Sequence, residues 1–507
     1  MAIDKPRRSV NPVDSTFHPK LLARQLLKPQ VCYSFNTIAM RTMNMIMACL
    51  LLCSFNGCAQ TSVTSPLLSG PWLLTLTTAD AGRLQTVMTF ETDEQKTKDT
   101  MLFHAWSEKN MDRKILGNIK ASLGRIAGSN FKDGSLIRII KGEFIRKDSL
   151  IGVLVTPFGN YYIHLSLNKG YIAGTLNDGN HSIVGAIEGS KGQPEMPLCN
   201  YPKIVDSALK IAEAKLYDPS LLKTAAWLNF KNEIKRVSAI TGDDAALVMA
   251  FFYYGRKLPF SHVALYVPAS ADTGFLEQED NDPVLLEQSP ETAYLKISSF
   301  GGTAGPMDKV FEKIDAKGYS NLIVDLRGNP GGSIEAGMAF ARHLLKDTLY
   351  VGVLLTQQYF RTHNKPPMPR DYRNFPEFSA ANYNLLLKGI SEYPGICLKG
   401  FPQSPIFKGN LYMLIDERTA STCEPIVYSM KQYHLATVIG QKTAGAMLNG
   451  ESFAIGCGYM ITVPTATYYA SDGFKIDQQG VLPDVVLKDE DALDYVLTQI
   501  KAAQKHE

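Results

Sequence analysis

Alternating apolar and polar positions run through residues 70–191 in short segments separated by turn-forming residues. A period of two places the apolar side chains on one face of a strand, and Asn, Asp and Gly favour the turns between strands. The clearest of these segments are 72–76, 85–90, 152–155 and 161–165. The pattern predicts a separate antiparallel β domain, a barrel or a sandwich, with Trp72 as a core residue.

The periodicity becomes helical after a linker at residues 192–197. Amphipathic patterns cover 203–216, 220–238 and 243–256, and Asp243-Asp244 after Gly242 forms a good start for the last helix. An extended run, 263–267, follows. We therefore expect a short helical segment within residues 200–268.

Short apolar runs alternate with helical patterns in residues 292–490. The expected strands are 294–297, 322–326, 411–415 and 436–439, and the expected helices are 306–317, 333–345 and 425–430. Such alternation is typical of an α/β core with parallel strands. A Pro- and Tyr-rich stretch, 356–409, interrupts the core, and long irregular stretches of this kind often form binding loops or lids. A C-terminal helix is expected at 491–507.

Residues 40–58 resemble a secretory signal of the bacterial lipoprotein type. Arg41 precedes an apolar run, 46–55, which is too short for a membrane span of about 20 residues, and Cys58 follows Gly57. We expect residues 1–57 to hold a mis-assigned start and a cleaved signal peptide, with translation beginning at Met40 or Met43. Cys58 would then carry lipid, residues 58–69 would be a tether, and the protein would be anchored in the cell envelope, facing the periplasm or the cell surface.

The charge and the cysteine spacing reduce the number of functions that the sequence allows. Residues 1–57 hold seven Lys/Arg and two Asp/Glu, which leaves 45 and 47 for residues 58–507, a net charge of −2. The absence of a basic stripe argues against nucleic acid as a partner. Cys199, Cys397, Cys423 and Cys457 are widely spaced without a Cys-x-x-Cys pair, so zinc is not expected. One or two disulfides are compatible with an oxidising periplasm, and their pairing stays open.

The segment 419–424, Thr-Ala-Ser-Thr-Cys-Glu, carries the strongest candidate chemistry. It joins the expected strand 411–415 to the expected helix 425–430. A serine at this junction meets outward-pointing N–H groups and the positive end of the helix dipole, which would stabilise an oxyanion. Ser421 is therefore a candidate nucleophile. Ser421-x-x-Glu424 is also a capping box, and from these residues alone capping is the commoner role.

A second signal is the glycine-rich turn in residues 325–332, Asp-Leu-Arg-Gly-Asn-Pro-Gly-Gly, between an expected strand and an expected helix. Glycines allow close backbone approach, and a phosphate-binding loop is the alternative. The Walker spacing with its Lys-Ser/Thr is absent, which argues against a nucleotide site.

These motifs belong to a series that resembles tail-specific (C-terminal-processing) and tricorn-like serine peptidases. The blocks that occur in the family's order are 294–300, 325–332, 419–424, 438–440 with 443–445, and 480–484. The resemblance covers roughly residues 200–507. It implies a ClpP/crotonase-like α/β core, Ser421 as nucleophile, the backbone amides of Gly331 and Thr422 as oxyanion hole, and no metal or cofactor.

The resemblance also implies the general base. Tail-specific proteases use a lysine in a Gly-Lys-Gly element, but Ala446 stands at that place, and the nearby Lys442 is expected to be a surface residue. Tricorn-like members use a Ser-His pair ahead of the core and a late acid. On this pattern His262 is the general base, Ser261 assists it, and Asp477 orients it in place of the usual Glu. The other nearby candidate, Cys423, is expected to be a buried thiol.

The predicted fold is thus multidomain α+β, and the predicted function is a serine endopeptidase that hydrolyses a peptide or protein substrate through a Ser-His-Asp acyl-enzyme mechanism. The stretch 268–293 is too short for the PDZ domain that tail-specific proteases usually carry, so capture of a C-terminus by strand addition is not expected. Two alternatives remain: a non-proteolytic binding protein of the same fold for a hydrophobic ligand or peptide, and an esterase. Oligomeric state stays open.

Overall fold

A computed structural model describes residues 67–78, 82–97, 100–107, 135–156, 159–179, 181–269, 282–379 and 382–504. These residues belong to one compact unit, 64–507. The expectations for the signal peptide, for the start at Met40 or Met43 and for Cys58 lie outside the described residues.

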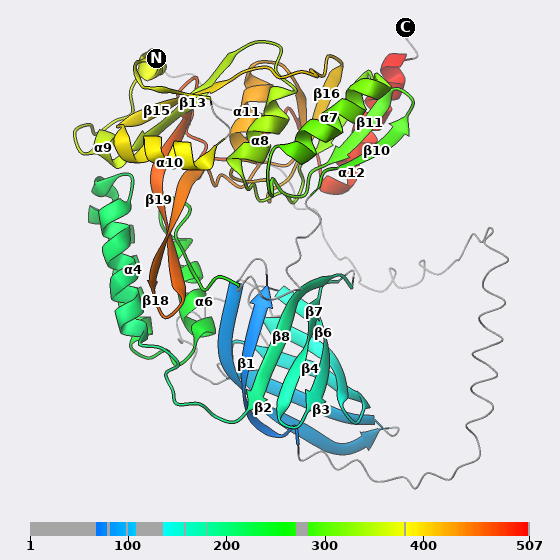
Figure 1. The fold of residues 1–507 in the computed structure, drawn as a ribbon, viewed down its shortest axis with the longest axis vertical. Coiled ribbons are helices and arrows are strands. Elements are labelled where there is room, and N and C mark those ends of the chain that lie inside the picture. Colours follow the sequence, from blue (N-terminus) through cyan, green and yellow to red (C-terminus); the bar gives the residue numbers. More distant parts are fainter. Residues whose placement is uncertain are drawn as a thin grey trace, which may run out of the picture. The chain divides into compact units, whose positions relative to one another are not determined.

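The first part of the described chain is a closed antiparallel barrel of eight strands, each hydrogen-bonded to the next and the last to the first (Figure 1). Its strands are β1 (Gly70–Thr78), β2 (Gly82–Thr97), β3 (Thr100–Ser107), β4 (Arg138–Arg146), β5 (Ser149–Thr156), β6 (Gly159–Asn168), β7 (Tyr171–Asn177) and β8 (Ile183–Lys191). Trp72 is fully buried, and its indole N–H donates to the Leu68 carbonyl at 2.6 Å. The expected antiparallel β domain and its tryptophan core are confirmed.

A helical segment follows the barrel, as expected. It comprises α4 (Tyr201–Lys215), the 3₁₀ turn η2 (Pro219–Lys223), α5 (Ala225–Ser238), α6 (Asp244–Gly255) and the short strand β9 (Ala264–Tyr266). Asp243 caps α6 by accepting from the Ala246 N–H at 3.0 Å. The same carboxylate accepts from the Thr86 hydroxyl of β2 at 2.8 Å, so the cap also joins the helix to the barrel.

The α/β core contains a six-stranded sheet in the order β10-β11-β12-β16-β17-β20. Its strands are β10 (Val284–Ser289), β11 (Thr292–Lys296), β12 (Asn321–Asp325), β16 (Asn410–Ile415), β17 (Thr437–Gly440) and β20 (Val485–Val486), all parallel except β10. One apolar core joins the sheet to α7 (Gly305–Lys317), α8 (Ile334–Arg342) and α11 (Cys423–Gln432), and a second joins it to α12 (Asp489–Gln504). The sheet therefore has helices on both faces, and the expectation of a parallel core is confirmed.

The stretch 356–409 differs from expectation, because much of it is regular. It contains α9 (Gln357–Phe360), η3 (Pro369–Asn374), β14 (Glu377–Phe378), α10 (Tyr383–Glu392) and β15 (Gly395–Gly400). Two of these strands enter a second sheet of order β14-β15-β13-β19-β18, with β13 (Leu349–Thr356), β18 (Leu448–Gly456) and β19 (Tyr459–Ala470). Pairing of β15 with β13 satisfies backbone groups that an irregular loop would leave to water.

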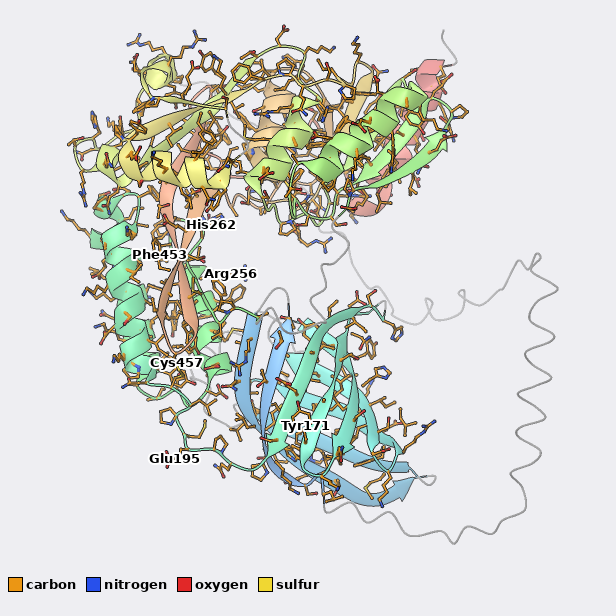
Figure 2. The ribbon with its side chains drawn as sticks, viewed as in Figure 1. Tyr171, Glu195, Arg256, His262, Phe453 and Cys457 are labelled. Carbon is orange, nitrogen blue, oxygen red and sulfur yellow. A yellow bond between two sulfur atoms is a disulfide. The ribbon has the colours of Figure 1, made fainter. Side chains whose placement is uncertain are left out.

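The β18–β19 hairpin connects the helical segment to the core. Its tip carries Cys457, which forms a disulfide with Cys199 just before α4, and β19 pairs with β9 (Figure 2). In the part of the chain that the structure describes, no helix is both long and apolar enough to cross a membrane.

Candidate active site

Ser421 lies in a tight turn between β16 and α11. Its backbone φ is 52°, a left-handed value that is uncommon for a residue other than glycine and is frequent where strain serves a function. Helix α11 begins at Cys423 with Thr422 at its N-cap and no side-chain capping bond. Among the described residues Ser421 Oγ has no hydrogen-bond partner, so the hydroxyl is not used as a helix cap.

Glu424 makes the other half of the expected capping box. Its buried carboxylate accepts from the Ser421 N–H at 3.1 Å, the Thr443 hydroxyl at 2.6 Å, the Gly445 N–H at 2.7 Å and the Ala446 N–H at 2.8 Å. Burial raises the pKa of Glu424, and the four donors partly oppose that shift. Glu424 thus fixes the backbone of the serine while leaving its hydroxyl unoccupied.

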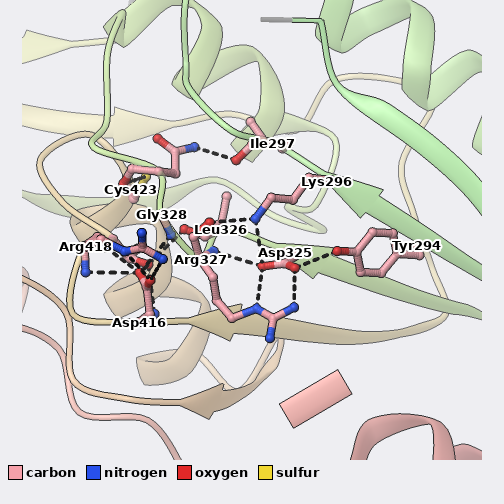
Figure 3. A network of polar contacts seen from close by, with 12 residues as sticks. Tyr294, Lys296, Ile297, Asp325, Leu326, Arg327, Gly328, Asp416, Arg418 and Cys423 are labelled. Atoms are coloured by element: carbon pink, nitrogen blue, oxygen red, sulfur yellow. Dashed lines mark hydrogen bonds and ion pairs between the residues drawn. The ribbon is translucent and has the colours of Figure 1, made fainter. Parts of the chain in front are cut away.

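Two buried carboxylates hold the glycine-rich turn beside Ser421 (Figure 3). Asp325 at the end of β12 accepts two bonds from the Arg327 guanidinium, at 2.9 and 2.6 Å, and one from the Tyr294 hydroxyl at 2.6 Å. Asp416, which follows β16, accepts from the Gly328 N–H and the Thr419 N–H, both at 2.9 Å. Asp416 therefore ties the glycine-rich turn to the turn that carries Ser421.

Gly331 approaches the serine closely. A Cβ atom added to Gly331 would lie 2.7 Å from Ser421 Cβ and 3.0 Å from the Thr422 nitrogen, and its φ is 101°, so only glycine fits there. In this structure, however, the Gly331 N–H donates to Asn329 Oδ1 at 2.8 Å. The neighbouring Gly332 lines the cavity beside Ser421 together with Thr422, and neither backbone N–H has a hydrogen-bond partner among the described residues.

His262 lies between α6 and β9, also with a left-handed φ, 63°. Its ring packs on Gly450 of β18, where an added Cβ would lie 3.0 Å from His262 Cδ2. Ser261 Oγ lies 2.6 Å from His262 Nδ1 and donates to Asp477 Oδ1 at 2.6 Å. The expected histidine, helper serine and acid therefore form one chain, with the serine between the other two.

Burial has the largest effect on the pKa values of His262 and Asp477. It lowers the pKa of His262 to about 4, because the charged imidazolium would lose its hydration. It raises the pKa of Asp477, against the hydrogen bond from Ser261. The second carboxylate oxygen of Asp477 is buried without a partner in the described structure.

Ser421 and His262 line the same cavity, which has a volume of about 580 Å³. Neither Ser421 Oγ nor His262 Nε2 has a hydrogen-bond partner among the described residues, and the two are not within hydrogen-bonding distance of each other. Catalytic hydrogen bonds are often long before substrate binds. The cavity thus brings the candidate nucleophile Ser421 and the candidate base His262, from separate segments, to one space.

The other candidates lie where they were expected. Lys442 is exposed and does not line the cavity, and the Ala446 N–H is bonded to Glu424. Cys423 is fully buried, and burial raises the pKa of its thiol. The other free cysteine among the described residues, Cys397, is also a buried thiol.

Three residues of the site were not assigned from the sequence: Glu424 as the support of the Ser421 backbone, Asn329 as the partner of Gly331, and Gly450 as the surface under His262. The Ser-x-x-Glu pattern contained a signal for Glu424. Asn329 stands inside the glycine-rich motif, and its fully buried amide also donates to the Ile297 carbonyl at 3.0 Å. Nothing local in the sequence marks Gly450.

Comparison with known proteins shows which families and proteins this chain resembles. Residues 291–487 match the model "Peptidase family S41". The carboxyl-terminal-processing protease of Synechocystis sp. is 24% identical over 199 residues, which cover 38% of this chain and 38% of the relative. The chloroplastic carboxyl-terminal-processing peptidase 1 of Arabidopsis thaliana is 21% identical over 285 residues, 55% of this chain and 50% of the relative. The chain thus spans half or less of the length of these relatives.

A solved lipoprotein structure from Streptococcus agalactiae aligns with 62% of this chain and 99% of its own, at 17% identity and a TM-score of 0.42. The similarity to peptidases rests instead on the family match over residues 291–487 and on the order of the motifs along the chain. Residues 291–487 are thus similar to peptidase family S41, and the chain is similar over 199 residues to a carboxyl-terminal-processing protease.

Proposed function

We propose that the protein is a serine endopeptidase in which Ser421 attacks the scissile carbonyl of a peptide or protein substrate. One observation carries the proposal. Ser421 and His262 line one cavity, and neither Ser421 Oγ nor His262 Nε2 has a hydrogen-bond partner among the described residues. Ser261 and Asp477 hold the other side of the His262 ring. The parallel sheet with helices on both faces also supports a core of the ClpP/crotonase type.

The hydrogen bonds around Ser261 determine which nitrogen of His262 is the base. Ser261 has one hydroxyl proton and gives it to Asp477 Oδ1, so its oxygen accepts from His262 Nδ1. A proton on Nδ1 leaves the lone pair of Nε2 available. His262 Nε2 then takes the proton of Ser421 as the serine attacks and returns it to the leaving amine, and water completes deacylation by the same route.

The negative charge of the tetrahedral intermediate requires backbone donors beside Ser421. Thr422 N–H at the start of α11 is one, favoured by the helix dipole. Gly331, the donor expected from the sequence, would have to release Asn329 Oδ1 to serve as the second. Gly332 is the alternative, because it lines the cavity and its N–H has no partner among the described residues.

An unbiased cleavage profile tests this function. Wild type, Ser421→Ala and His262→Ala would be incubated with a diverse peptide mixture, and products read by mass spectrometry. Ser391→Ala is the matched control, because Ser391 is exposed on α10 and its hydroxyl donates to the Lys388 carbonyl of the same helix. Cleavage by wild type and the control, lost in both site variants, supports the peptidase. Cleavage that survives Ser421→Ala, or hydrolysis of small esters alone, contradicts it.

We also propose that the protein is exported and lipid-anchored at Cys58. The Cys199–Cys457 disulfide supports an oxidising compartment. Intact-mass analysis of the protein purified from a bacterial envelope would then find a mature N-terminal Cys58 carrying a diacylglycerol adduct, absent in Cys58→Ser. A mature chain that retains residues N-terminal to Cys58, or lacks the adduct, would contradict this.

A further inference from the structure

The cavity beside Ser421 is walled by two helices that start at the site and run side by side. The Thr422 hydroxyl at the start of α11 donates to the Gly332 carbonyl just before α8, at 2.8 Å. One turn into α8, a Cβ added to Gly337 would lie 2.4 Å from Thr422 Cγ2. The cavity follows both helices away from Ser421, as far as Leu345 beyond α8 and Met430 on α11.

The lining is largely apolar, and among its polar side chains two have a buried polar atom without a partner in the described structure: Arg342 at the end of α8 and Ser429 in α11. Ser429 is only 4% exposed, and its hydroxyl has no hydrogen-bond partner in the described structure. The Nε–H of Arg342 is likewise buried without a partner, although its Nη2 donates to the Ser379 carbonyl. A second cation in the lining, Lys399, is paired with Glu377 at 3.0 Å.

Burying the Arg342 Nε–H and the Ser429 hydroxyl without hydrogen-bond partners costs folding free energy, unless a bound group pairs with them. The depth of the two atoms sets the size of a group that could bind them from the site. Ser429 is nearly two helical turns beyond Thr422, about 10 Å along the axis, and helix side chains lean toward the N-terminus, back toward Ser421. A group that starts at Ser421 and reaches these atoms must have a long apolar body and a polar end.

We propose that this cavity selects a tyrosine as the residue whose carbonyl Ser421 attacks, with Arg342 and Ser429 binding the tyrosine hydroxyl. The hydroxyl accepts from Arg342 Nε and donates to Ser429 Oγ, which satisfies all three groups. The ring packs on the apolar walls supplied by Met338, Leu386 and Ile426. Tryptophan can only donate, phenylalanine and leucine leave both polar atoms unpaired, and glutamate lacks the apolar body.

The ratio of kcat/KM for a tyrosine substrate to kcat/KM for the matching phenylalanine substrate tests the inference. A site with buried polar groups rejects a substrate that leaves them unpaired. One hydrogen bond to a charged group corresponds to roughly 10- to 100-fold in kcat/KM. The inference rests on the proposed function, because the carbonyl must be attacked by Ser421 for the side chain to enter this space.

The experiment uses one peptide, with flanks taken from the cleavage profile, in which the residue before the cleaved bond is Tyr, Phe, Trp, Leu or Glu. For the wild type, kcat/KM for the Tyr peptide should exceed that for the Phe peptide by about 10- to 100-fold. Ser429→Ala and Arg342→Met should each reduce the Tyr-to-Phe ratio by about 10-fold or more. The controls Ser391→Ala and Arg370→Met, at exposed positions, should keep the wild-type ratio.

Labelling of Ser421 by a fluorophosphonate separates the two proposals. If Ser421 is labelled and peptides are cleaved but Tyr and Phe are equivalent, or if Trp, Leu or Glu is preferred, the tyrosine pocket is wrong while the peptidase stands. If the site variants lower kcat/KM for Tyr and Phe equally, the two residues serve only the fold. If Ser421 is neither labelled nor needed for cleavage, the proposed function itself fails.

Discussion

At the scale of the residue, the burial of His262 would set the pH range of the proposed peptidase activity. Its pKa is lowered from 6.5 to about 4, so the imidazole remains a neutral base well into the acid range. We expect kcat/KM on a peptide without titratable groups to be retained down to about pH 5 and to fall below about pH 4. A pH–rate profile measured where circular dichroism shows the folded state tests this. A midpoint near 6.5 would contradict it.

In the proposed mechanism, Asp477 would act on His262 through Ser261, which lies between the two side chains. Asp477 already reaches Ser261 at 2.6 Å, so the shorter side chain at this position needs no added methylene. Asp477→Asn would remove the charge that draws the Ser261 proton away from His262, and would thereby favour the wrong tautomer. We expect kcat to fall by roughly 100-fold or more with little change in KM.

The matched variant is Asp477→Glu, which keeps the charge but adds a methylene at a site only 1% exposed. Overpacking of this kind costs about 1–3 kcal/mol of stability. Glu should therefore lower the unfolding midpoint while retaining more activity than Asn. If Asn and Glu lose kcat equally, the carboxylate charge is not what positions the proton.

A residue of the site could be predicted from the sequence where a short motif around it already specifies the local structure. Ser421 and the glycine-rich turn stand in short motifs at strand–helix junctions, where the motif itself dictates the backbone. His262, Ser261 and Asp477 were reached only through the family's order of motifs. The bond from Gly331 to Asn329 could not be foreseen, because it depends on the conformation of one peptide group.

At the scale of the element, the β18–β19 hairpin positions His262, and the disulfide holds its tip. The hairpin pairs with β9 through Thr462 and Ala264, and Gly450 supports the imidazole ring. The double variant Cys199→Ser/Cys457→Ser should lose about 2–4 kcal/mol of unfolding free energy, measured by urea denaturation. It should also lower kcat, since β9 and His262 lose a fixed partner.

Two controls sharpen this prediction. Dithiothreitol should shift the wild type to the midpoint of the double variant and should leave the double variant unchanged. Cys397→Ala, which removes a buried thiol outside the disulfide, should retain sensitivity to dithiothreitol. A wild type insensitive to reduction under conditions where mass spectrometry shows the open disulfide would refute the role of the bridge.

Elements with long periodic patterns were predicted well, and those stabilised by distant pairing were not. Helices α4, α6 and α7 have clear apolar stripes or caps and lie within a few residues of their expected bounds. The stretch 356–409 looked irregular because its elements are short. Strand β15 owes its conformation to β13, through pairs such as Val353 with Cys397, and no local pattern reports such a partner.

At the scale of the whole molecule, hydrogen bonds around Asp244 form a polar junction that joins the barrel to the helical segment and to β19. Asp244 at the start of α6 is buried and accepts from the Tyr201 hydroxyl at 3.0 Å, the Tyr459 hydroxyl at 2.7 Å and the Gln85 N–H of the barrel at 3.2 Å. Nearby, the Arg83 N–H of β2 donates to the Val267 carbonyl at 2.8 Å, just beyond β9. The sequence predicted both parts but could not predict this junction, which depends on residues far apart in the chain.

The junction implies that the barrel stabilises the segment that carries His262. Asp244→Asn would turn an acceptor oxygen into a donor facing groups that already donate, which costs about 1–3 kcal/mol. We expect a lower urea midpoint and a lower kcat in one variant, because Tyr459 belongs to β19 and β19 pairs with β9. Asp206→Asn is the matched control, since its exposed pair with Lys235 contributes at most about 1 kcal/mol. If Asp244→Asn leaves kcat unchanged while it destabilises the fold, the barrel serves stability alone and its contact does not reach the active site.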